Sequence, residues 1–354
     1  MIRFAKIIWW ASVIWLVLWL VPNLYDFLLV QPQSTPFTLY STVTGDFAWI
    51  DRSQGHAIYT DREGKRYTES EFDSIFPFFY YRQLMADERF PDTLHGIAVS
   101  PRMAQTGSFM FKSTPLSYNA PKIELYPLLE SMSGRVDLKM PDDVFRITDR
   151  GIEFIGMTDN RVDAAKSDAY TEAMERKGFT FPPQIIAGNP TIKKEYDEGY
   201  LMTDKEGQLF HLKQVKGRPY CRHIALPDSL HVAHIFLTEF RDRRFLAFLV
   251  DDRHRMYVLY TGSYEIKQVE IPAFDPTREA ISIIGNPFDW TLSLTSLSDA
   301  SLYAIDAATL QCVGRMRHNT EVSLAEKLRQ YAMPLRLGFV SPIDPYVFPR
   351  INEY

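Results

Sequence analysis

The sequence contains 354 residues, of which 46% are hydrophobic and 23% are charged. This composition matches a globular protein that can bury a core, and it excludes a disordered or low-complexity chain. The formal net charge is −5, and Lys and Arg are scattered along the chain, so no basic stripe is available to bind nucleic acid. Aromatic residues make up 14% of the sequence, with 24 Phe and 19 Tyr, which favours β-sheets.

An apolar segment without charged residues lies near the N-terminus, from Ile7 to Val21. Arg3 and Lys6 precede it, and this charge asymmetry predicts that the N-terminus lies in the cytoplasm. We expect a membrane anchor whose apolar residues include Ile7, Trp9, Trp10, Trp15, Trp19 and Val21.

The segment is shorter than the roughly 20 residues of an average span, so a cleaved secretory signal and a buried soluble helix are the alternatives. The bulky residues from Val21 to Tyr25 do not resemble a signal-peptidase site, and Leu24 to Val30 adds apolar length. We therefore predict two parts, an anchor over residues 1–30 and one extracytoplasmic domain over residues 31–354. We expect a single-pass protein of the inner (cytoplasmic) membrane with its main domain in the periplasm or otherwise outside the cytoplasm.

One local pattern recurs along the domain: an Asp-containing turn, then Gly or a polar residue, then alternating apolar and polar residues. Each instance predicts a β-hairpin, because Asp and Gly suit tight turns and the alternation supplies strands with one buried face. The segments are Thr60–Tyr67, Thr148–Phe154, Thr203–Phe210, Asp251–Tyr257 and Ser298–Tyr303, with Gln105–Phe111 as a weaker example. A second motif, Pro-Asp before a strand, occurs at Pro91, Pro141 and Pro227.

Repeats of about 40 to 50 residues that each supply several short strands are typical of β-propeller blades. We predict a mostly β fold, a propeller-like ring of about five to seven blades with small helical inserts. In this ring the strand candidate Phe37–Ile50 completes the blade made by Gly338–Phe348. A β-sandwich is the alternative, because such hairpins occur in any long β protein.

Three segments interrupt the β pattern with helical spacing. Thr68 to Glu71 resembles a capping box ahead of an apolar face that runs to Leu84, with a break expected at Pro77. Arg161–Lys177 is polar and predicts an exposed helix over a long loop. Ser323–Tyr331 is the third segment, and Pro334 ends it.

The first hairpin, Tyr59–Tyr67, the segment Phe76–Leu84 and the Pro91-Asp92 motif resemble an uncharacterised bacterial envelope family. That family is a domain of unknown function behind a single N-terminal anchor, and its members are often encoded beside ABC-transporter subunits. The resemblance is best over the anchor and the first hundred residues or so. It implies an accessory protein of a membrane complex and assigns no catalytic residues.

Signatures of known catalytic sites are missing from the sequence: it has no GxSxG, HExxH, Walker A, CxxC or strand-linked GxGxxG motif. We therefore leave the catalytic residues unknown and expect no cofactor and no metal. The candidate metal group is Cys221, His223, His231 and His234. On a strand, His231 and His234 point to opposite faces, so ordinary strand or loop residues are the preferred interpretation.

The carboxylate pairs Asp251–Asp252 and Asp142–Asp143 are candidates for glycoside hydrolysis. Neighbouring residues on a strand diverge, so we prefer the interpretation that these side chains accept backbone N–H bonds in turns. Cys221 and Cys312 are compatible with one disulfide, and also with two free thiols.

An unusually aromatic cluster lies within the first of the three helical segments and is the candidate partner-docking surface. Its members are Phe76, Phe78, Phe79, Tyr80, Tyr81 and Arg82. Core packing of an amphipathic helix is the competing interpretation.

The function that we expect is non-enzymatic: a membrane-anchored binding or scaffolding protein of the bacterial envelope, accessory to an ABC transporter or to another envelope protein. The first alternative is an envelope hydrolase acting on glycans through carboxylates at one face of the propeller. The second is a ligand sensor that signals through a membrane partner, because only six residues precede the predicted span.

Overall fold

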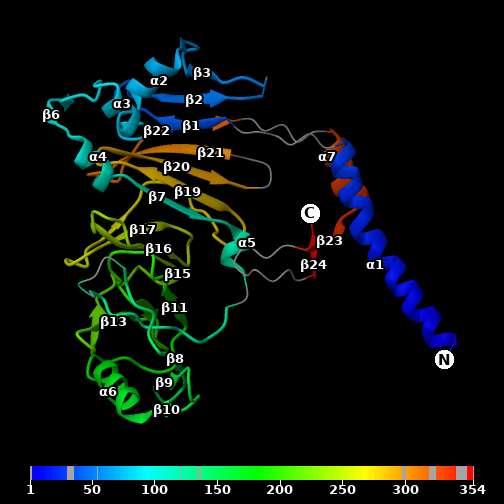
Figure 1. Ribbon diagram of the computed structural model, residues 1–354, viewed down its shortest axis with the longest axis vertical. Coiled ribbons are helices and arrows are strands. Elements are labelled where there is room, and N and C mark those ends of the chain that lie inside the picture. The colour runs from blue at the N-terminus through cyan, green and yellow to red at the C-terminus, as the bar shows by residue number, and fades with distance from the viewer. Residues whose placement is uncertain are drawn as a thin grey trace.

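The computed structural model describes residues 2–29, 36–53, 55–120, 122–132, 134, 137–296, 300–318, 324–339 and 349–353. Within these residues the protein is mostly β, with five antiparallel sheets of three to five strands and two short two-stranded hairpins. We number the five sheets by their order in the chain. One apolar helix precedes them all (Figure 1).

That helix, α1 (Ile2–Leu29), contains every residue predicted for the anchor. Residues Arg3–Leu29 are long and apolar enough to cross a membrane, and no other described helix is. The helix is longer than the predicted span because it continues through Pro22, where the ring removes one backbone hydrogen bond without ending the helix. Its apolar side chains are exposed, as expected for a helix whose partner is lipid.

The first sheet is a meander in sequence order. Its strands are β1 (Phe37–Tyr40), β2 (Phe47–Asp51), β3 (Ile58–Asp61) and β4 (Arg66–Tyr67). The helices α2 (Glu69–Ile75) and α3 (Tyr81–Ala86) follow. Thr68 and Glu71 form the predicted capping box, and the chain breaks around Pro77 as expected.

A connecting segment then leads away from the first sheet. Its elements are β5 (Thr93–Leu94), β6 (Ile97–Ala98), α4 (Pro101–Gly107), β7 (Phe109–Ser113) and α5 (Pro115–Tyr118). The hairpin predicted around Gly107 is wrong: Gly107 is the last residue of α4, with Pro101 in its first turn and Ser100 as its N-cap.

The next two sheets have a helix between them. The second sheet contains β8 (Asp143–Ile147), β9 (Ile152–Gly156) and β10 (Val162–Asp163), and α6 (Ala164–Glu175) follows it. The third contains β11 (Ile185–Gly188), β12 (Tyr200–Thr203), β13 (Leu209–Val215) and β14 (Arg218–Ile224). The expected helix is present, but it is not simply exposed, because Tyr170 and Met174 are buried. These residues are four apart and therefore share one face.

The last two sheets are also meanders. The fourth contains β15 (Val232–Leu237), β16 (Phe245–Asp251), β17 (Met256–Tyr260) and β18 (Ile266–Gln268). The fifth contains β19 (Ala280–Gly285), β20 (Asp289–Thr295), β21 (Ala300–Asp306) and β22 (Cys312–His318), with β7 added at the β19 edge. The register Gly285↔Phe109 to Ile281↔Ser113 fixes this insertion.

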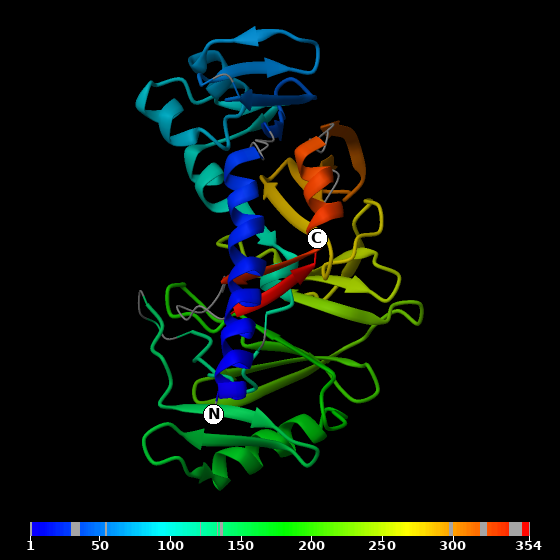
Figure 2. The same ribbon diagram turned by 90° about the vertical axis from the view of Figure 1, so that its right-hand side faces the viewer.

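The chain ends beside the anchor. The elements there are α7 (Leu324–Ala332), β23 (Leu335–Phe339) and β24 (Pro349–Glu353). Arg329 of α7 pairs with Asp26 of α1 at 2.5 Å, and the Tyr25 hydroxyl donates to the Ala325 carbonyl. The two views place α7 and the β23–β24 hairpin next to α1 (Figures 1 and 2).

Three of the predicted hairpins share one hydrogen-bond pattern in their turns. Asp61, Asp204 and Asp251 each accept, through Oδ1, the backbone N–H groups two and four residues further on. This confirms that these aspartates are turn residues. In the fifth sheet, residues 297–299 of the predicted hairpin lie outside the described part.

The five sheets stack face to face, but not in chain order. Phe154 and Phe210 share the core of the second and third sheets, and Leu209 and Leu249 that of the third and fourth. Phe248 and Trp290 join the fourth to the fifth. A further cluster, in which Phe47 packs with Leu302, joins the fifth to the first.

The first and second sheets, although consecutive in the sequence, therefore lie at opposite ends of the long axis (Figure 1). No closed ring is present among the described residues. The predicted pairing of Phe37–Ile50 with Gly338–Phe348 is wrong where it can be followed, because β1 pairs with β2 and β23 with β24. Residues 340–348 lie outside the described residues. The strand that does join a distant sheet is β7, whose Phe109 fits the aromatic core of the fourth and fifth sheets.

Candidate functional site: an apolar pocket with a buried carboxyl group

A cavity of about 280 Å³ lies where the first sheet, the α2–α3 connection and the fifth sheet meet. Its walls are mainly apolar and aromatic. They include Leu39, Tyr40, Phe76, Pro77, Phe78, Phe79, Tyr81, Phe109, Met110 and Ile284. Phe79 and Met110 are 40% and 63% exposed, so they form a hydrophobic rim that solvent reaches.

Local sequence features explain why these walls meet. Pro77 follows the end of α2 and turns the chain, so that Phe76, Phe78 and Phe79 are presented from a non-helical connection. On the opposite wall, Gly285 has no side chain, and the ring of Phe109 occupies the space that a Cβ would need. The pocket is therefore built by four segments of the chain, which lie within residues 39–42, 76–81, 108–110 and 284–291.

One part of the wall is polar. The Asp289 carboxylate accepts a hydrogen bond from the Thr42 hydroxyl at 2.5 Å and one from the Asn286 amide at 2.9 Å. Burial raises the pKa of Asp289 to about 6, although both hydrogen bonds oppose the shift. Ser108 also lines the pocket, and its buried hydroxyl oxygen has no hydrogen-bond partner among the described residues. The pocket thus offers an apolar surface with a small set of hydrogen-bonding groups.

The structure divides the aromatic cluster that the sequence singled out as a docking surface. Phe76 and Phe78 are buried, and Tyr80 packs against the core of the first sheet. Phe79 and Arg82 are exposed, and the guanidinium of Arg82 donates to the Tyr81 hydroxyl at 3.1 Å. Core packing therefore accounts for Phe76, Phe78 and Tyr80, whereas docking of a partner by the exposed residues stays a prediction.

The predicted carboxylate pairs do not act together. Asp251 is buried in its turn with its side chain bonded to Arg255, while Asp252 is exposed. Asp142 and Asp143 border a depression, but Asp143 binds Lys166 at 2.6 Å. These contacts give Asp251 and Asp143 each a structural partner.

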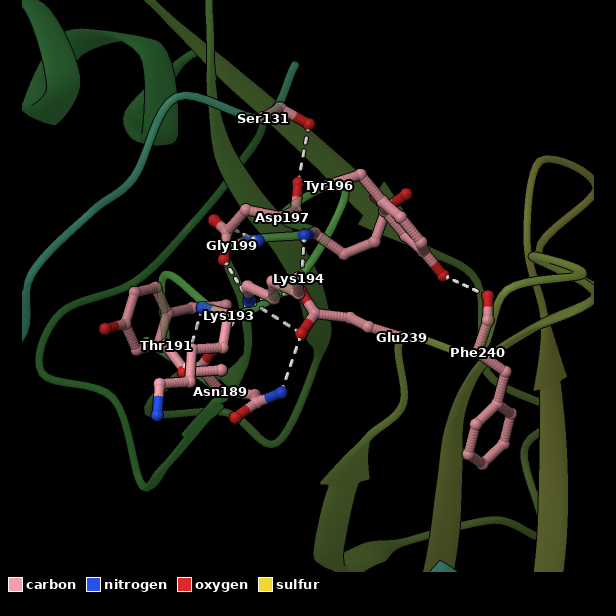
Figure 3. Close-up of polar contacts among 12 residues, drawn as sticks. Ser131, Asn189, Thr191, Lys193, Lys194, Tyr196, Asp197, Gly199, Glu239 and Phe240 are labelled. Atoms are coloured by element: carbon pink, nitrogen blue, oxygen red, sulfur yellow. Dashed lines mark hydrogen bonds and ion pairs between the residues drawn. The ribbon is translucent and has the colours of Figure 1, made fainter. Parts of the chain in front are cut away.

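Buried charges gather instead between the third and fourth sheets (Figure 3). The Lys194 ammonium lies 2.5 Å from Asp197 and 2.6 Å from Glu239. Burial raises the pKa of both carboxyl groups, and Lys194 opposes that shift. Glu239 also accepts from the Glu198 backbone N–H and the Asn189 amide, so its oxygens are fully used. We interpret this cluster as a clip between two sheets rather than a reactive site.

The cysteines and histidines of the sequence analysis lie apart. Cys221 is a buried core residue of the third sheet, Cys312 lies in the fifth sheet, and both are free thiols. His223 and His231 are exposed, whereas His234 hydrogen-bonds to Tyr118. The predicted group of four is therefore not assembled.

Sequence reasoning missed the polar wall of the pocket. Asp289 and Thr42 are 247 residues apart, and neither belongs to a motif. The only sequence signal for this polar wall was a local one, the turn flanked by Asn286 and Asp289, whose side chains hydrogen-bond to each other.

Together these features define a mostly β protein behind one apolar N-terminal helix, with an apolar pocket between its first and fifth sheets. The chain belongs to the family of the domain of unknown function DUF4857, whose model matches residues 37–305. No curated protein matches it.

Solved structures give only remote likenesses. Hydrazine synthase of Kuenenia stuttgartiensis is 12% identical, with 57% of this chain and 52% of that chain covered and a TM-score of 0.29. The Dos1 propeller is 11% identical over 55% of this chain and 48% of its own, with a TM-score of 0.28. The β-propeller domain of Cps50 (Swd1) from Myceliophteria thermophila is 10% identical, with 62% of this chain and 63% of that chain covered and a TM-score of 0.29. The chain thus spans about half the length of the first two, and likenesses this weak carry no conclusion.

Proposed function

We propose that this protein is a non-enzymatic binding or scaffolding protein of the bacterial envelope, anchored in the inner membrane and accessory to an ABC transporter. The observation that carries the proposal is the apolar pocket with Phe79 and Met110 exposed at its rim. Exposed large apolar residues around a concave site are typical of binding surfaces. In this proposal a partner inserts a large apolar side chain into the pocket.

The size and chemistry of the pocket support a side chain as its occupant. Its volume, about 280 Å³, lies at the lower end of small-molecule pockets and is roughly that of one or two large side chains. Interface hot spots are aromatic or apolar anchors in desolvated pockets, surrounded by a few polar contacts. The Ser108 hydroxyl and the Asp289 carboxyl supply such polar contacts here, for a backbone N–H or an indole N–H of the partner.

The placement in the membrane is also a proposal. Arg3 and Lys6 at the start of α1 favour a cytoplasmic N-terminus and a periplasmic domain. The helix α7 lies beside the C-terminal end of α1. Three of its apolar residues are exposed and recur at helical spacing: Leu324, Leu328 and Tyr331. An apolar stripe next to a membrane-spanning helix favours contact with the same bilayer.

The propeller-like ring remains our proposal for the fold. The first, third, fourth and fifth sheets each contain four consecutive antiparallel strands, the arrangement of a propeller blade. With the three strands of the second sheet they supply five blades, the lower end of the predicted range.

Site-specific photocrosslinking in native membranes tests the proposed function. A photoreactive phenylalanine at Phe79 or Met110 is expected to crosslink to a membrane-associated partner, which mass spectrometry identifies as a transporter permease. Met157 is the matched control, because it is 54% exposed and directly follows β9 of the second sheet, far from the pocket.

A second variant separates binding from folding. Phe79→Ser removes an exposed ring and is expected to leave the fold intact, whereas Phe78→Ser places a hydroxyl in the core and destabilises it. A folded Phe79→Ser protein that loses its crosslinks at Met110 supports the proposal. Equal crosslinking at Met110 and Met157, or crosslinks to lipid alone at the rim, would overturn it.

A further inference from the structure

Three potential metal ligands from separate segments meet at one end of the fourth sheet. His234 lies on β15, His254 in the turn between β16 and β17, and Asp275 in the connection to β19. One ligand atom from each residue lies within 4.8 Å of the others. The backbone holds two of the segments together, because the Phe274 N–H donates to the His254 carbonyl.

His254 has an unexpected backbone conformation. The turn that begins at Asp251 has the same hydrogen bonds as those at Asp61 and Asp204. In all three turns the residue three positions after the aspartate has a positive φ. These residues are Gly64 (φ 85°), Gly207 (φ 79°) and His254 (φ 62°). Glycine is the residue that this conformation favours, and histidine takes its place in this one turn.

The second observation concerns one ring nitrogen of His254. Its Nδ1 atom is buried and makes no hydrogen bond within the described residues. A buried ring nitrogen without a partner is costly in an apolar setting, and a bound cation would satisfy it.

The neighbouring groups are arranged as metal ligands usually are. The Tyr118 hydroxyl lies 2.6 Å from Nδ1 of His234 and fixes its ring, the role of an outer-shell partner. Oδ1 of Asp275 accepts from the backbone N–H and hydroxyl of Thr277, which orients the carboxylate. Oδ2 remains for a cation, with only the exposed Arg278 guanidinium nearby at 3.7 Å.

We propose that His234, His254 and Asp275 bind one divalent transition-metal ion, with Zn²⁺ as the ion that their chemistry favours. Two imidazoles and one carboxylate form a mixed nitrogen and oxygen site that suits Zn²⁺ and leaves a coordination position open. Bonds of about 2.1 Å place tetrahedral ligand atoms about 3.4 Å apart, so binding requires only small side-chain rotations from the present arrangement. The site is independent of the pocket and its proposed partner.

The test uses the full-length protein in detergent, stripped with EDTA and titrated with Zn²⁺ by calorimetry, with bound metal counted after dialysis. The wild-type protein is expected to bind one equivalent, and Zn²⁺ is expected to raise its thermal midpoint. His254→Gly is the informative variant, because it restores the glycine of the other two turns and so keeps the fold. Its Zn²⁺ affinity is expected to fall at least about tenfold, as is that of Asp275→Asn.

Exposed histidines outside the cluster supply the controls. His223→Ala and His231→Ala are expected to bind Zn²⁺ like the wild type, although both were members of the group that the sequence suggested. The proposal is overturned if the stripped wild-type protein takes up no Zn²⁺. It is also overturned if a folded His254→Gly protein binds Zn²⁺ with wild-type affinity.

Discussion

At the scale of single residues, aspartate has two opposite roles in this protein. In the turns at Asp61, Asp204 and Asp251 the side chain accepts backbone N–H groups that would otherwise lack partners. Asp251 shows the effect on ionisation: burial raises its pKa, but the bonds from its turn and from Arg255 outweigh burial and leave the pKa lowered. For Asp289 the hydrogen bonds from Thr42 and Asn286 do not outweigh burial, and its pKa is raised.

The raised pKa of Asp289 predicts a pH dependence of stability. An unfolded carboxyl group titrates near 3.8 and the folded one near 6, so between these values the folded state binds the extra proton. The contribution of Asp289 to stability is therefore full below the unfolded pKa and is lost as pH rises through the folded pKa. Asp289→Asn, which cannot ionise, is expected to be more stable than the wild type at pH 8, by at most roughly 3 kcal/mol.

Guanidinium unfolding at pH 5 and pH 8 measures this effect, and the advantage of Asp289→Asn is expected to shrink at the lower pH. Asp252→Asn, at an exposed position, is the control and is expected to follow the wild type at both values. Parallel pH profiles of Asp289→Asn and the wild type would show that Asp289 is not desolvated.

At the scale of secondary-structure elements, sheet contacts combine apolar packing with one buried ionic clip. Lys194 and Asp197 belong to the β11–β12 connection, and Glu239 to the β15–β16 connection (Figure 3). The clip therefore ties the third sheet to the fourth in addition to the contacts of their apolar faces.

Helices were simpler to predict than these contacts between sheets, because the α2 capping box lies within four adjacent residues.

Lys194→Ala leaves two buried carboxylates without their cation. Removing one partner of a buried ion pair typically costs about 3–5 kcal/mol, so we expect a loss of that order in the free energy of unfolding. Chemical denaturation measures it, with Lys193→Ala as the control, because Lys193 is exposed and is the immediate neighbour. A loss below about 1 kcal/mol, the value of surface pairs, would mean that water reaches the cluster.

At the scale of the whole molecule, the last described elements, α7 and the β23–β24 hairpin, return to α1, the first helix (Figures 1 and 2). Arg329 and Asp26 form that return contact. The helix α1 itself runs beside the stack of sheets, roughly along its long axis (Figures 1 and 2).

A fusion of alkaline phosphatase to the C-terminus tests the proposed orientation. We expect an active enzyme, because the phosphatase folds only outside the cytoplasm and the charges before α1 favour a cytoplasmic N-terminus. A fusion that begins at residue 36 and lacks α1 is the control, and it is expected to be inactive. An inactive full-length fusion, together with an active β-galactosidase fusion, would reverse the topology.

The sequence alone determined the features whose causes are local. The apolar run predicted α1, the capping box predicted α2, and the Asp turns predicted hairpins at four positions, because each depends on residues within a few positions of one another. Tertiary structure decided which distant segments of the chain meet. The insertion of β7 beside β19, the meeting of Thr42 with Asp289, and the approach of His254 to Asp275 all join distant segments. Such contacts are set by which apolar faces pack together, and a periodic pattern shows that a face is apolar without showing which face covers it.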